Sequence, residues 1–398
     1  MKKVLLVIPY GSVGGMERLA LYFYGHYKKK GIKVLVVKFF SLGNDIIYFG
    51  NDEIALSKID LHEMSVLKRL SFYLSCPLRL HRIVKKNGIT HTISFGDMAN
   101  LFSSLSFSKE FKVGSIHALK SSEFAHTNIF NKIFRISYKS SYIFLDKVVC
   151  ISKGIKDDLI DNCGFKFKRK LKVIYNPHDI ENIRSLGNEK IEIDSEVDIF
   201  KSDVLLFVGR LSLQKAPWHL VRAFNIIKDD YPNSKLVFIG DGSDEISKYL
   251  KLLIQKYKIV NKVFFLGRKK NPYKYIKRAK LLCLSSYYEG TPNVIVEAMS
   301  LRVPIISTNC TEGVGELMSG NRIKNSDDII KTAVGYITPN IFKGKLDIPP
   351  MSELIQEDEK LSQAMALVLE GQGFYGQNSN VLLDKFNLDS VAEEYLKN

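Results

Sequence analysis

The sequence predicts an α/β protein built from two doubly wound domains, each with a parallel sheet. Short runs of Val, Ile, Leu and Phe alternate with longer segments of helical spacing, as is typical of parallel sheets covered by helices on both faces. This succession stops at an acidic stretch over residues 179–202 and then starts again. A length of 398 residues, with 45% hydrophobic and 25% charged residues, is enough for two such domains.

The first half of the chain supplies the elements of one domain. Its apolar runs lack polar alternation, which predicts strands buried on both faces, and the segments between them have the length of helices. The expected strands are Val4–Ile8, Val34–Phe39, Thr90–Ser94, Lys112–Ile116, Lys147–Ile151 and Leu171–Ile174. The expected helices cover residues 16–30, 64–86, 126–144 and 152–162.

The second half repeats the same alternation. The expected strands are Val204–Val208, Leu236–Ile239, Val263–Leu266, Leu281–Ser285 and Val303–Ser307. The expected helices cover about 215–230 and 244–257, and another begins near residue 293. Residues 320–350 fit the alternation poorly, so we expect an inserted loop there.

These patterns divide the chain into four parts. The acidic composition of residues 179–202 predicts a linker. We therefore expect a first domain over 1–178, a second over 203–372, and a C-terminal helical segment over 373–398 that packs back on the first domain.

Composition excludes several classes of protein. The five cysteines are odd in number and form no C-x-x-C pair, which argues against a disulfide framework or a structural zinc site and favours a reducing compartment. The apolar run near the N-terminus is only about six residues long, too short for a signal peptide or a membrane span. No other stretch approaches the roughly 18 uncharged apolar residues that a spanning helix needs.

The basic excess lies entirely in the first half of the chain. Residues 1–178 hold 29 Lys and Arg against 13 Asp and Glu, whereas the remaining residues hold 29 of each, so the net charge of +16 belongs to the first half. Such asymmetry points to an anionic partner, either nucleic acid or an anionic lipid surface. The alternative is a solvated face that aids solubility.

The first turn from strand to helix is rich in glycine. Residues 11–17 read Gly-Ser-Val-Gly-Gly-Met-Glu, with Gly14 and Gly15 just before the helix. Backbone N–H groups in such a turn can approach a phosphate. The spacing matches neither G-x-G-x-x-G nor a Walker loop, so a plain tight turn is nearly as good an interpretation.

Two cations follow the first strand of the second half. Arg210 and Lys215 lie in the stretch Gly-Arg-Leu-Ser-Leu-Gln-Lys that begins at Gly209. Cations at the carboxyl end of a strand and beside a helix start suit a diphosphate. The alternative is an ordinary pair of surface charges.

The sharpest pattern is Tyr-Glu-Gly-Thr-Pro-Asn-Val-Ile-Val-Glu-Ala-Met over residues 288–299. It places Glu289 and Glu297 on either side of a turn that opens a helix. Thr291 or Asn293 is expected to cap that helix, whose free N–H groups suit an anion. A surface position is the alternative for either glutamate alone.

In this arrangement the chain resembles the retaining glycosyltransferases of family 4, which have the two-domain GT-B fold. The resemblance covers nearly the full length. It rests on Gly14-Gly15, residues 115–118 (Ser-Ile-His-Ala), 149–152 (Val-Cys-Ile-Ser), 173–177 (Val-Ile-Tyr-Asn-Pro), Gly209-Arg210 with Lys215, Gly240-Asp-Gly242, residues 265–267 (Phe-Leu-Gly) and the Glu289/Glu297 pair. Residues 320–350 depart from the family pattern.

The resemblance implies a role for each matching residue. Glu297 would bind the ribose of a nucleotide, and Glu289 would contact the hydroxyls of the donor sugar. His117 would reach the donor sugar from the first domain. The remaining donor-binding residues implied are Gly14, Gly15, Arg210, Lys215, Arg268, Gly290, Thr291, Pro292, Asn293 and Val294.

Asp97 follows the expected strand Thr90–Ser94, where it could touch an acceptor hydroxyl, although a solvated surface position is an equal alternative. No D-x-D motif or His/Asp metal cluster is visible. We therefore expect neither a metal nor another cofactor, so that cations and helix N-termini would neutralise a leaving diphosphate. With no enzyme nucleophile among these motifs, the resemblance implies front-face attack by an acceptor hydroxyl.

The leading hypothesis is therefore transfer of a hexose or N-acetylhexosamine from a nucleotide diphosphate sugar, with UDP expected, to a lipid-linked or lipid-anchored cell-surface glycan. The first alternative is a nucleotide-sugar epimerase of the same architecture. The second is a basic nucleic-acid-binding protein, but no RNP-type, zinc-finger or helix-turn-helix pattern supports it, so no nucleic-acid partner is expected.

Three stretches combine cations with apolar residues: 68–86, 132–139 and 166–172. Such segments can lie at a headgroup interface with apolar side chains inserted. We expect a cytoplasmic protein, peripheral on the anionic inner face of the cell membrane. The alternative is a core helix with a solvated basic face, which Pro77 favours.

Overall fold

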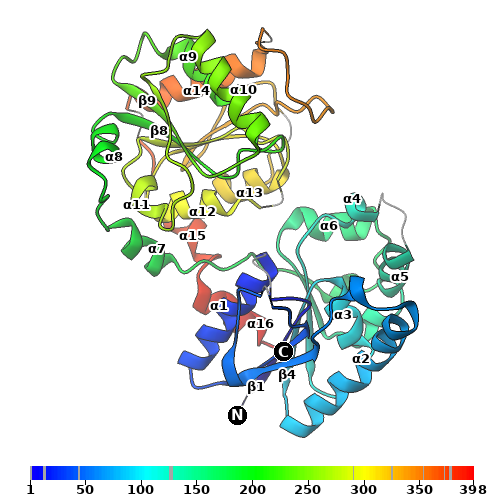
Figure 1. The fold of residues 1–398 in the computed structure, drawn as a ribbon. Coiled ribbons are helices and arrows are strands. Elements are labelled where there is room, and N and C mark those ends of the chain that lie inside the picture. The colour runs from blue at the N-terminus through cyan, green and yellow to red at the C-terminus, as the bar shows by residue number, and fades with distance from the viewer. Residues whose placement is uncertain are drawn as a thin grey trace. The chain divides into compact units, whose positions relative to one another are not determined.

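The computed structural model divides the chain into two compact units, Met1–Pro177 with Lys385–Asn398 and His178–Asp384 (Figure 1). The structure describes residues 2–11, 15–43, 45–124, 129–289, 291–323, 326–352, 354–371, 373–375 and 379–398. Each unit is an α/β domain around a seven-stranded sheet of described residues. The expected fold class is confirmed.

The first unit contains a parallel sheet in the order β3-β2-β1-β4-β5-β6-β7. Its strands are β1 (Lys3–Ile8), β2 (Lys33–Phe40), β3 (Glu53–Ser57), β4 (His91–Phe95), β5 (Phe111–Ile116), β6 (Lys147–Cys150) and β7 (Leu171–Val173). Its helices are α1 (Gly15–Lys29), α2 (Val66–Asn87), α3 (Asp97–Ser104), α4 (Lys120–Phe124), α5 (Ile129–Ser137), α6 (Lys153–Asp161) and α16 (Leu388–Tyr395). Short 3₁₀ turns are η1 (Gly50–Asp52), η2 (Leu61–Glu63), η3 (Ser141–Phe144) and η4 (Lys168–Lys170).

Alternate residues of β1 enter two separate cores, one on each face of the sheet. Leu6 packs with α1 and α16, whereas Leu5 and Val7 pack with α2 and α3. The C-terminal helix is held by a hydrogen bond from the Tyr27 hydroxyl to the Ala392 carbonyl, 2.8 Å long. Burial on both faces explains why these strands are continuously apolar.

The second unit has the order β10-β9-β8-β11-β12-β14-β13, and only the β13–β14 pair is antiparallel. Its strands are β8 (Asp203–Val208), β9 (Ser234–Ile239), β10 (Val263–Phe265), β11 (Leu281–Leu284), β12 (Ile305–Thr308), β13 (Ile330–Lys331) and β14 (Gly335–Thr338). Its helices are α7 (Ile180–Gly187), α8 (Asp194–Ile199), α9 (Trp218–Ile227), α10 (Asp244–Lys256), α11 (Tyr273–Ile276), α12 (Asn293–Ser300), α13 (Glu312–Ser319), α14 (Gln356–Leu369) and α15 (Ser379–Asp384).

The structure adds β3, α3, α13 and α14 to the expected elements, and it differs from them in three further regions. Residues 179–202 hold α7 and α8 and belong to the second unit; their acidic side chains pair with Lys269 and Lys274, which stand near α11. The 320–350 stretch contributes β14, which extends the sheet beside β12. The 126–144 helix is shorter: α5 ends at Ser137 and η3 follows, while 125–128 lie outside the described residues.

No helix of the described residues is both long and apolar enough to cross a bilayer. The longest amphipathic element of the first unit, α2, continues through Pro77 without ending. It ends at Gly88, which adopts the left-handed conformation and caps it.

Candidate functional site

The second sheet changes direction of winding at β8. Strand β8 lies between β9 and β11, so successive connections leave its carboxyl edge on opposite faces. Ligands of open α/β sheets bind in the crevice at such a switch point. The loops that follow β8 and β11 carry Arg210, Lys215 and Glu289, and the structure therefore brings these three residues to one edge of one sheet.

Hydrogen bonds tie these two loops together. The Ser285 hydroxyl donates to the carbonyls of Lys215 and Ala216, at 3.0 and 2.9 Å. The Gln214 side-chain amide donates to the Tyr288 carbonyl at 2.9 Å, and the Tyr287 amide returns a bond to the Gln214 carbonyl at 2.8 Å. The loops form one piece, so the charges on them have fixed relative positions.

A partly buried ion pair lies where the loops meet. The Lys215 ammonium pairs with the Glu289 carboxylate, whose side chain is 10% exposed, and the Ser286 hydroxyl donates to the same carboxylate oxygen at 2.8 Å. Because each partner neutralises the other, neither charge is left uncompensated on burial. Burial, with Glu289 nearby, raises the pKa of the Cys310 thiol to about 12, so this thiol is not a thiolate at neutral pH.

Helix α12 begins beside Glu289 without a side-chain cap. Its N-cap is Pro292, and no described side chain bonds the first amides, so the expectation that Thr291 or Asn293 caps this helix is wrong. The proline side chain pre-sets the backbone but offers no acceptor for a cap, so the Pro292 carbonyl, rather than a side chain, accepts a bond here, from the Ile295 amide at 3.1 Å. The open N-terminus is suited to an anion.

The remaining residues of this motif are partly described. Val294 and Glu297 are half-buried on α12, Asn293 is exposed, and Gly290 lies outside the described residues. Glu297 is thus on the helix that starts at the site, about one turn after its first residue.

Two predicted cations remain exposed at this edge. Arg210 follows β8 and makes no ion pair with any described residue, and Arg268 is held only through its backbone amide, which donates to the Asp241 carboxylate at 3.1 Å. The turns that bear them approach closely, because a Cβ at Gly240 would lie 1.9 Å from the Gly209 carbonyl oxygen. These arginines are available to an incoming anion.

The first sheet has its own switch point, between β1 and β4. Gly14 lies outside the described residues, and Gly15 is the first residue of α1. Gly11, which follows β1, is closely packed, because a Cβ there would come within 2.4 Å of the Asp45 carboxylate.

That carboxylate belongs to a buried network which the sequence analysis missed. The Lys38 ammonium pairs with Asp45 at 3.1 Å and with Glu53 at 3.0 Å, and it donates to the Ile47 carbonyl. One signal was available: Lys38 is the only charged side chain inside the apolar run 34–40. A lysine in a buried strand requires acidic partners.

His117 directly follows β5, as predicted. Its ring lies 6.2 Å from that of Phe95, centroid to centroid, and its Nε2 is hydrogen-bonded to the Ser115 hydroxyl. Burial lowers the pKa of the imidazole to about 3, and the positive charge of Lys120 acts in the same direction. The ring is therefore neutral at physiological pH.

Asp97 is the first residue of α3 and is not a solvated side chain. It accepts a hydrogen bond of 2.7 Å from the Tyr138 hydroxyl and pairs with the Lys120 ammonium at 2.8 Å. Lys120 and Asp97 are both nearly buried. We therefore assign Asp97 to holding Lys120 beside His117, and neither Lys120 nor Tyr138 was singled out from the sequence.

Acidic, histidine and cysteine side chains do not cluster in the manner of a metal site. Within the described ranges, no three or more of them are grouped so as to hold an ion.

Two family patterns match the chain. Residues 189–325 match the family described as Glycosyl transferases group 1, and residues 13–182 match Glycosyltransferase Family 4. The first range includes the loops that follow β8 and β11, and the second includes Asp97 and His117.

Relatives extend the match along the sequence. An uncharacterized glycosyltransferase of Methanocaldococcus jannaschii is 32% identical over 274 residues, which span 67% of this chain and 66% of that protein. A Campylobacter jejuni 4-α-N-acetylgalactosaminyltransferase, named for a diphospho-undecaprenol-linked substrate, is 33% identical but matches only 43% of this chain and 44% of its own length. A second Campylobacter jejuni α-1,4-N-acetyl-D-galactosaminyltransferase is 26% identical over 100% of this chain and 98% of its own.

Solved structures share the fold at low identity. The Anabaena protein HepE in complex with UDP and glucose superposes with a TM-score of 0.68 at 18% identity, covering 100% of this chain and 98% of its own. The apo lipopolysaccharide outer core galactosyltransferase WaaB gives a TM-score of 0.64 at 18% identity, again over 100% and 98%. These likenesses show the GT-B fold.

The burial of His117 leads to a prediction about the pH at which its imidazole is protonated. We expect its imidazole to stay neutral from pH 8 down to about 5 in the folded protein, because burial lowers its pKa to about 3. Histidine NMR against pH measures this, and the same resonance in urea-unfolded protein should titrate near about 6.5. Since the folded state then binds fewer protons, His117 destabilises the protein as the pH falls from about 6.5 towards 3. A folded-state midpoint above about pH 5 would contradict the assignment.

Proposed function

The chain belongs to the family 4 glycosyltransferases of the GT-B fold. We propose that it transfers a hexose or N-acetylhexosamine from a nucleotide diphosphate sugar, and that this donor is a UDP-sugar. The acceptor is a hydroxyl of a lipid-linked cell-surface glycan. The reaction retains the anomeric configuration and needs no metal. The observation that supports this most is the Lys215–Glu289 pair beside the open N-terminus of α12.

The residues at the β8/β11 edge have complementary tasks in this reaction. Arg210, Lys215 and the first amides of α12 bind the diphosphate and stabilise the charge that it gains on leaving. Glu289 contacts the sugar and stabilises the positive charge that develops at its anomeric carbon. Glu297 binds the ribose, and the backbone near Arg268 meets the base.

The transfer itself balances without an enzyme nucleophile. The bond from the anomeric carbon to the diphosphate oxygen breaks while the acceptor oxygen bonds to the same face. The acceptor proton passes to the departing phosphate oxygen. Neutral His117 donates or accepts a hydrogen bond at the sugar and does not carry charge.

The acceptor assignment draws on the relatives. Both Campylobacter jejuni proteins are named for undecaprenol diphosphate-linked substrates, and others are named for capsular polysaccharide and amylovoran biosynthesis. We therefore place this chain in bacterial polysaccharide assembly on a lipid carrier.

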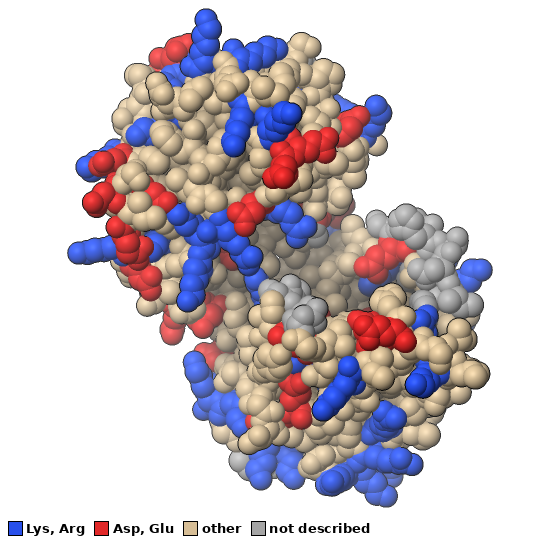
Figure 2. Space-filling view, viewed as in Figure 1, with Lys and Arg blue, Asp and Glu red and all other residues tan. Residues whose placement is uncertain are grey.

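Association with the anionic inner face of the membrane accompanies this function. Figure 2 shows Lys and Arg gathered over the end of the first unit where Figure 1 places α2. Helix α2 contains no Asp or Glu. One of its faces enters the core, but a second apolar face points outward, with exposed fractions of 55 to 80% for Leu67, Leu70, Leu74 and Leu78.

An outward row of leucines followed by cations on the same helix suits a headgroup interface. Positions 67, 70, 74 and 78 continue at helical spacing to Arg82 and Lys86, both exposed. Apolar side chains insert, while each cation contributes about 1 kcal/mol on an anionic leaflet. The outward leucines favour this proposal over a core helix with a solvated basic face, since such a face would need no exposed apolar row.

The reaction is tested by incubating labelled UDP-sugars with a polyprenyl diphosphate-linked saccharide in the presence of EDTA. We expect donor turnover only when acceptor is present, with the α-configuration of the donor kept in the product by NMR. Donor turnover without acceptor would indicate the epimerase instead. Activity that EDTA abolishes and Mn²⁺ or Mg²⁺ restores would overturn metal independence.

Glu289→Gln is expected to lower kcat by about 10²-fold or more, because one preorganised electrostatic partner of the transition state is lost. UDP binding, measured by calorimetry, should weaken much less. Glu359→Gln, the same change at an exposed position of α14, is the matched control. A variant with near wild-type kcat would remove Glu289 from the mechanism.

Arg210→Ala and Lys215→Ala are each expected to weaken UDP binding about 10- to 100-fold, the worth of one charge-assisted hydrogen bond. Uridine, which lacks the diphosphate, should bind almost as before. Lys251→Ala on the exposed face of α10 controls for general charge. If UDP and uridine weaken alike, the diphosphate contacts are misassigned.

Replacing Leu67, Leu70, Leu74 and Leu78 with Ser is expected to reduce binding to anionic vesicles about tenfold or more without unfolding the protein, since these side chains are exposed. Vesicle sedimentation measures this. The matched control replaces exposed Leu252 and Val260 of the second unit with Ser. Wild-type binding should also fall as salt rises to about 0.5 M, and equal binding to neutral and anionic vesicles would contradict the proposal.

A further inference from the structure

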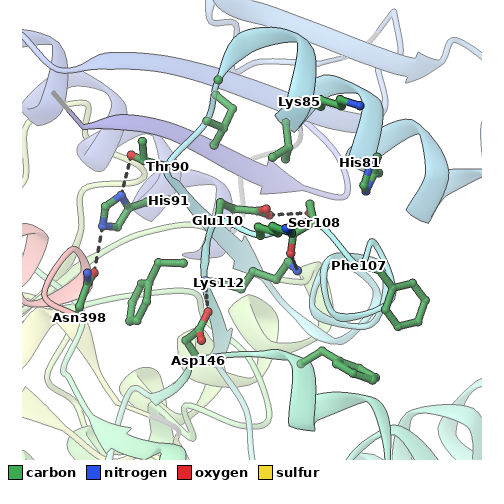
Figure 3. A pocket seen from close by; sticks show the side chains of 16 residues that line it. His81, Lys85, Thr90, His91, Phe107, Ser108, Glu110, Lys112, Asp146 and Asn398 are labelled. Atoms are coloured by element: carbon green, nitrogen blue, oxygen red, sulfur yellow. Dashed lines mark hydrogen bonds between the residues drawn. The ribbon is translucent and has the colours of Figure 1, made fainter.

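A cavity of about 1160 Å³ lies in the first unit, away from the candidate catalytic residues (Figure 3). It is formed by the second half of α2, by the turns that lead into β4, β5 and β6, and by Asn398. These turns precede the strands, whereas Asp97 and His117 follow β4 and β5. The cavity is therefore at the amino edge of the sheet, opposite the edge that carries the candidate site.

The floor of the cavity presents an unused acceptor. Glu110 is 9% exposed, and its Oε1 accepts hydrogen bonds from Thr92 at 2.9 Å and Ser108 at 3.0 Å. Its Oε2 is buried and has no hydrogen-bond partner among the described residues. Buried carboxylate oxygens normally have a hydrogen-bond partner, so this atom is suited to a ligand whose hydroxyl group donates a hydrogen bond to it.

The rim is cationic. Lys85 of α2 and Lys109 of the turn before β5 are exposed, and neither makes an ion pair with a described residue. Figure 3 shows Lys85 and His81 on one side of Glu110 and Ser108, with Asp146 on the other. Asp146 accepts a hydrogen bond of 2.7 Å from the backbone amide of Lys112 and keeps its negative charge. The lining holds Lys85, Lys109 and Lys112 against Glu110 and Asp146, so its positive side chains outnumber the negative ones.

Two aromatic rings border the same cavity. Phe107 and Phe144 are 63% and 48% exposed, and their rings meet edge to face with centroids 5.1 Å apart. Phe107 has φ of 52°, a left-handed conformation that is strained for a bulky residue. The backbone thus holds an apolar ring in solvent, which suits contact with lipid rather than water.

We propose that this cavity binds the headgroup of an anionic phospholipid that carries free hydroxyls, of the phosphatidylglycerol type. The phosphate lies between Lys85 and Lys109, and a headgroup hydroxyl donates to Glu110 Oε2. Phe107 and Phe144 contact the glycerol and upper acyl region. The inference rests on the membrane association proposed above, because exposed Lys85 lies about two turns beyond Leu78 on α2.

The test uses the full-length protein and dihexanoyl lipids below their micelle concentration, so that no membrane is required. We expect saturable calorimetric binding of dihexanoyl phosphatidylglycerol, at least about fivefold weaker binding of phosphatidic acid, which lacks the hydroxyls, and none of phosphatidylcholine. Inorganic phosphate should bind no better than phosphatidic acid. Phosphatidic acid or phosphate binding as tightly as phosphatidylglycerol would overturn the headgroup assignment and leave only a phosphate site.

Variants locate the binding. Lys85→Ser with Lys109→Ser should weaken phosphatidylglycerol binding at least about tenfold. Lys29→Ser with Lys33→Ser, the same charge change at exposed positions outside both the cavity lining and α2, should weaken it less than twofold. Glu110→Gln should reduce the ratio by which phosphatidylglycerol binds more tightly than phosphatidic acid. Equal losses in both double variants would mean diffuse attraction and would defeat the cavity proposal. If vesicles bind through the leucines but dihexanoyl phosphatidylglycerol does not bind, the cavity proposal fails and membrane association stands.

Discussion

In a parallel sheet every strand starts at the amino edge and ends at the carboxyl edge, so each connection must carry the chain back to the amino edge. Most of the architecture of this protein follows from that requirement. All strands of the first sheet and nearly all of the second end at one edge, so the loops that leave them are collected there. At β1/β4 and β8/β11 the winding reverses and neighbouring loops diverge. His117 in one unit, and Lys215 with Glu289 in the other, reach their places because each follows a strand that is buried on both faces.

The pairing of Lys215 with Glu289 then sets the electrostatics of the second unit's site. A lone carboxylate at 10% exposure would be costly, and the lysine offsets that cost. A diphosphate that draws on the same lysine adds negative charge beside Glu289. Exposed Arg210 and the uncapped start of α12 supply the additional positive potential that such a ligand needs. In the proposed reaction, the sugar contact of Glu289 and the phosphate contact of Lys215 would thus be linked through one ammonium group.

The sequence was informative wherever a local pattern determines the structure. The apolar runs without alternation predicted eleven of the fourteen described strands, but not β3, β13 or β14. The spacing of glycine, cations and glutamates after these runs predicted which residues meet at the edge of β8 and β11. What it did not reveal depends on contacts distant along the chain. Asp97 meets Lys120 and Tyr138 only through packing. Residues 179–202 have the composition of a linker because two of their acidic side chains pair with lysines 73 and 82 positions away. The α12 cap was missed because Pro292, not Thr291 or Asn293, occupies the capping position.

The two edges of the first sheet differ in chemistry, and α2 runs between them. The helix starts after β3 has ended at the carboxyl edge and finishes before β4 begins at the amino edge, a path of about 33 Å for its 22 residues. Its inward face, with Phe72, Cys76 and Leu80, holds it on the sheet, which leaves the outward leucines with no structural task. These leucines stay 55 to 80% exposed, and the proposed membrane association would give their apolar surface a partner. Since the same helix also supplies Lys85 to the cavity at the amino edge, insertion of the leucines would bring that cavity to the depth of the headgroups.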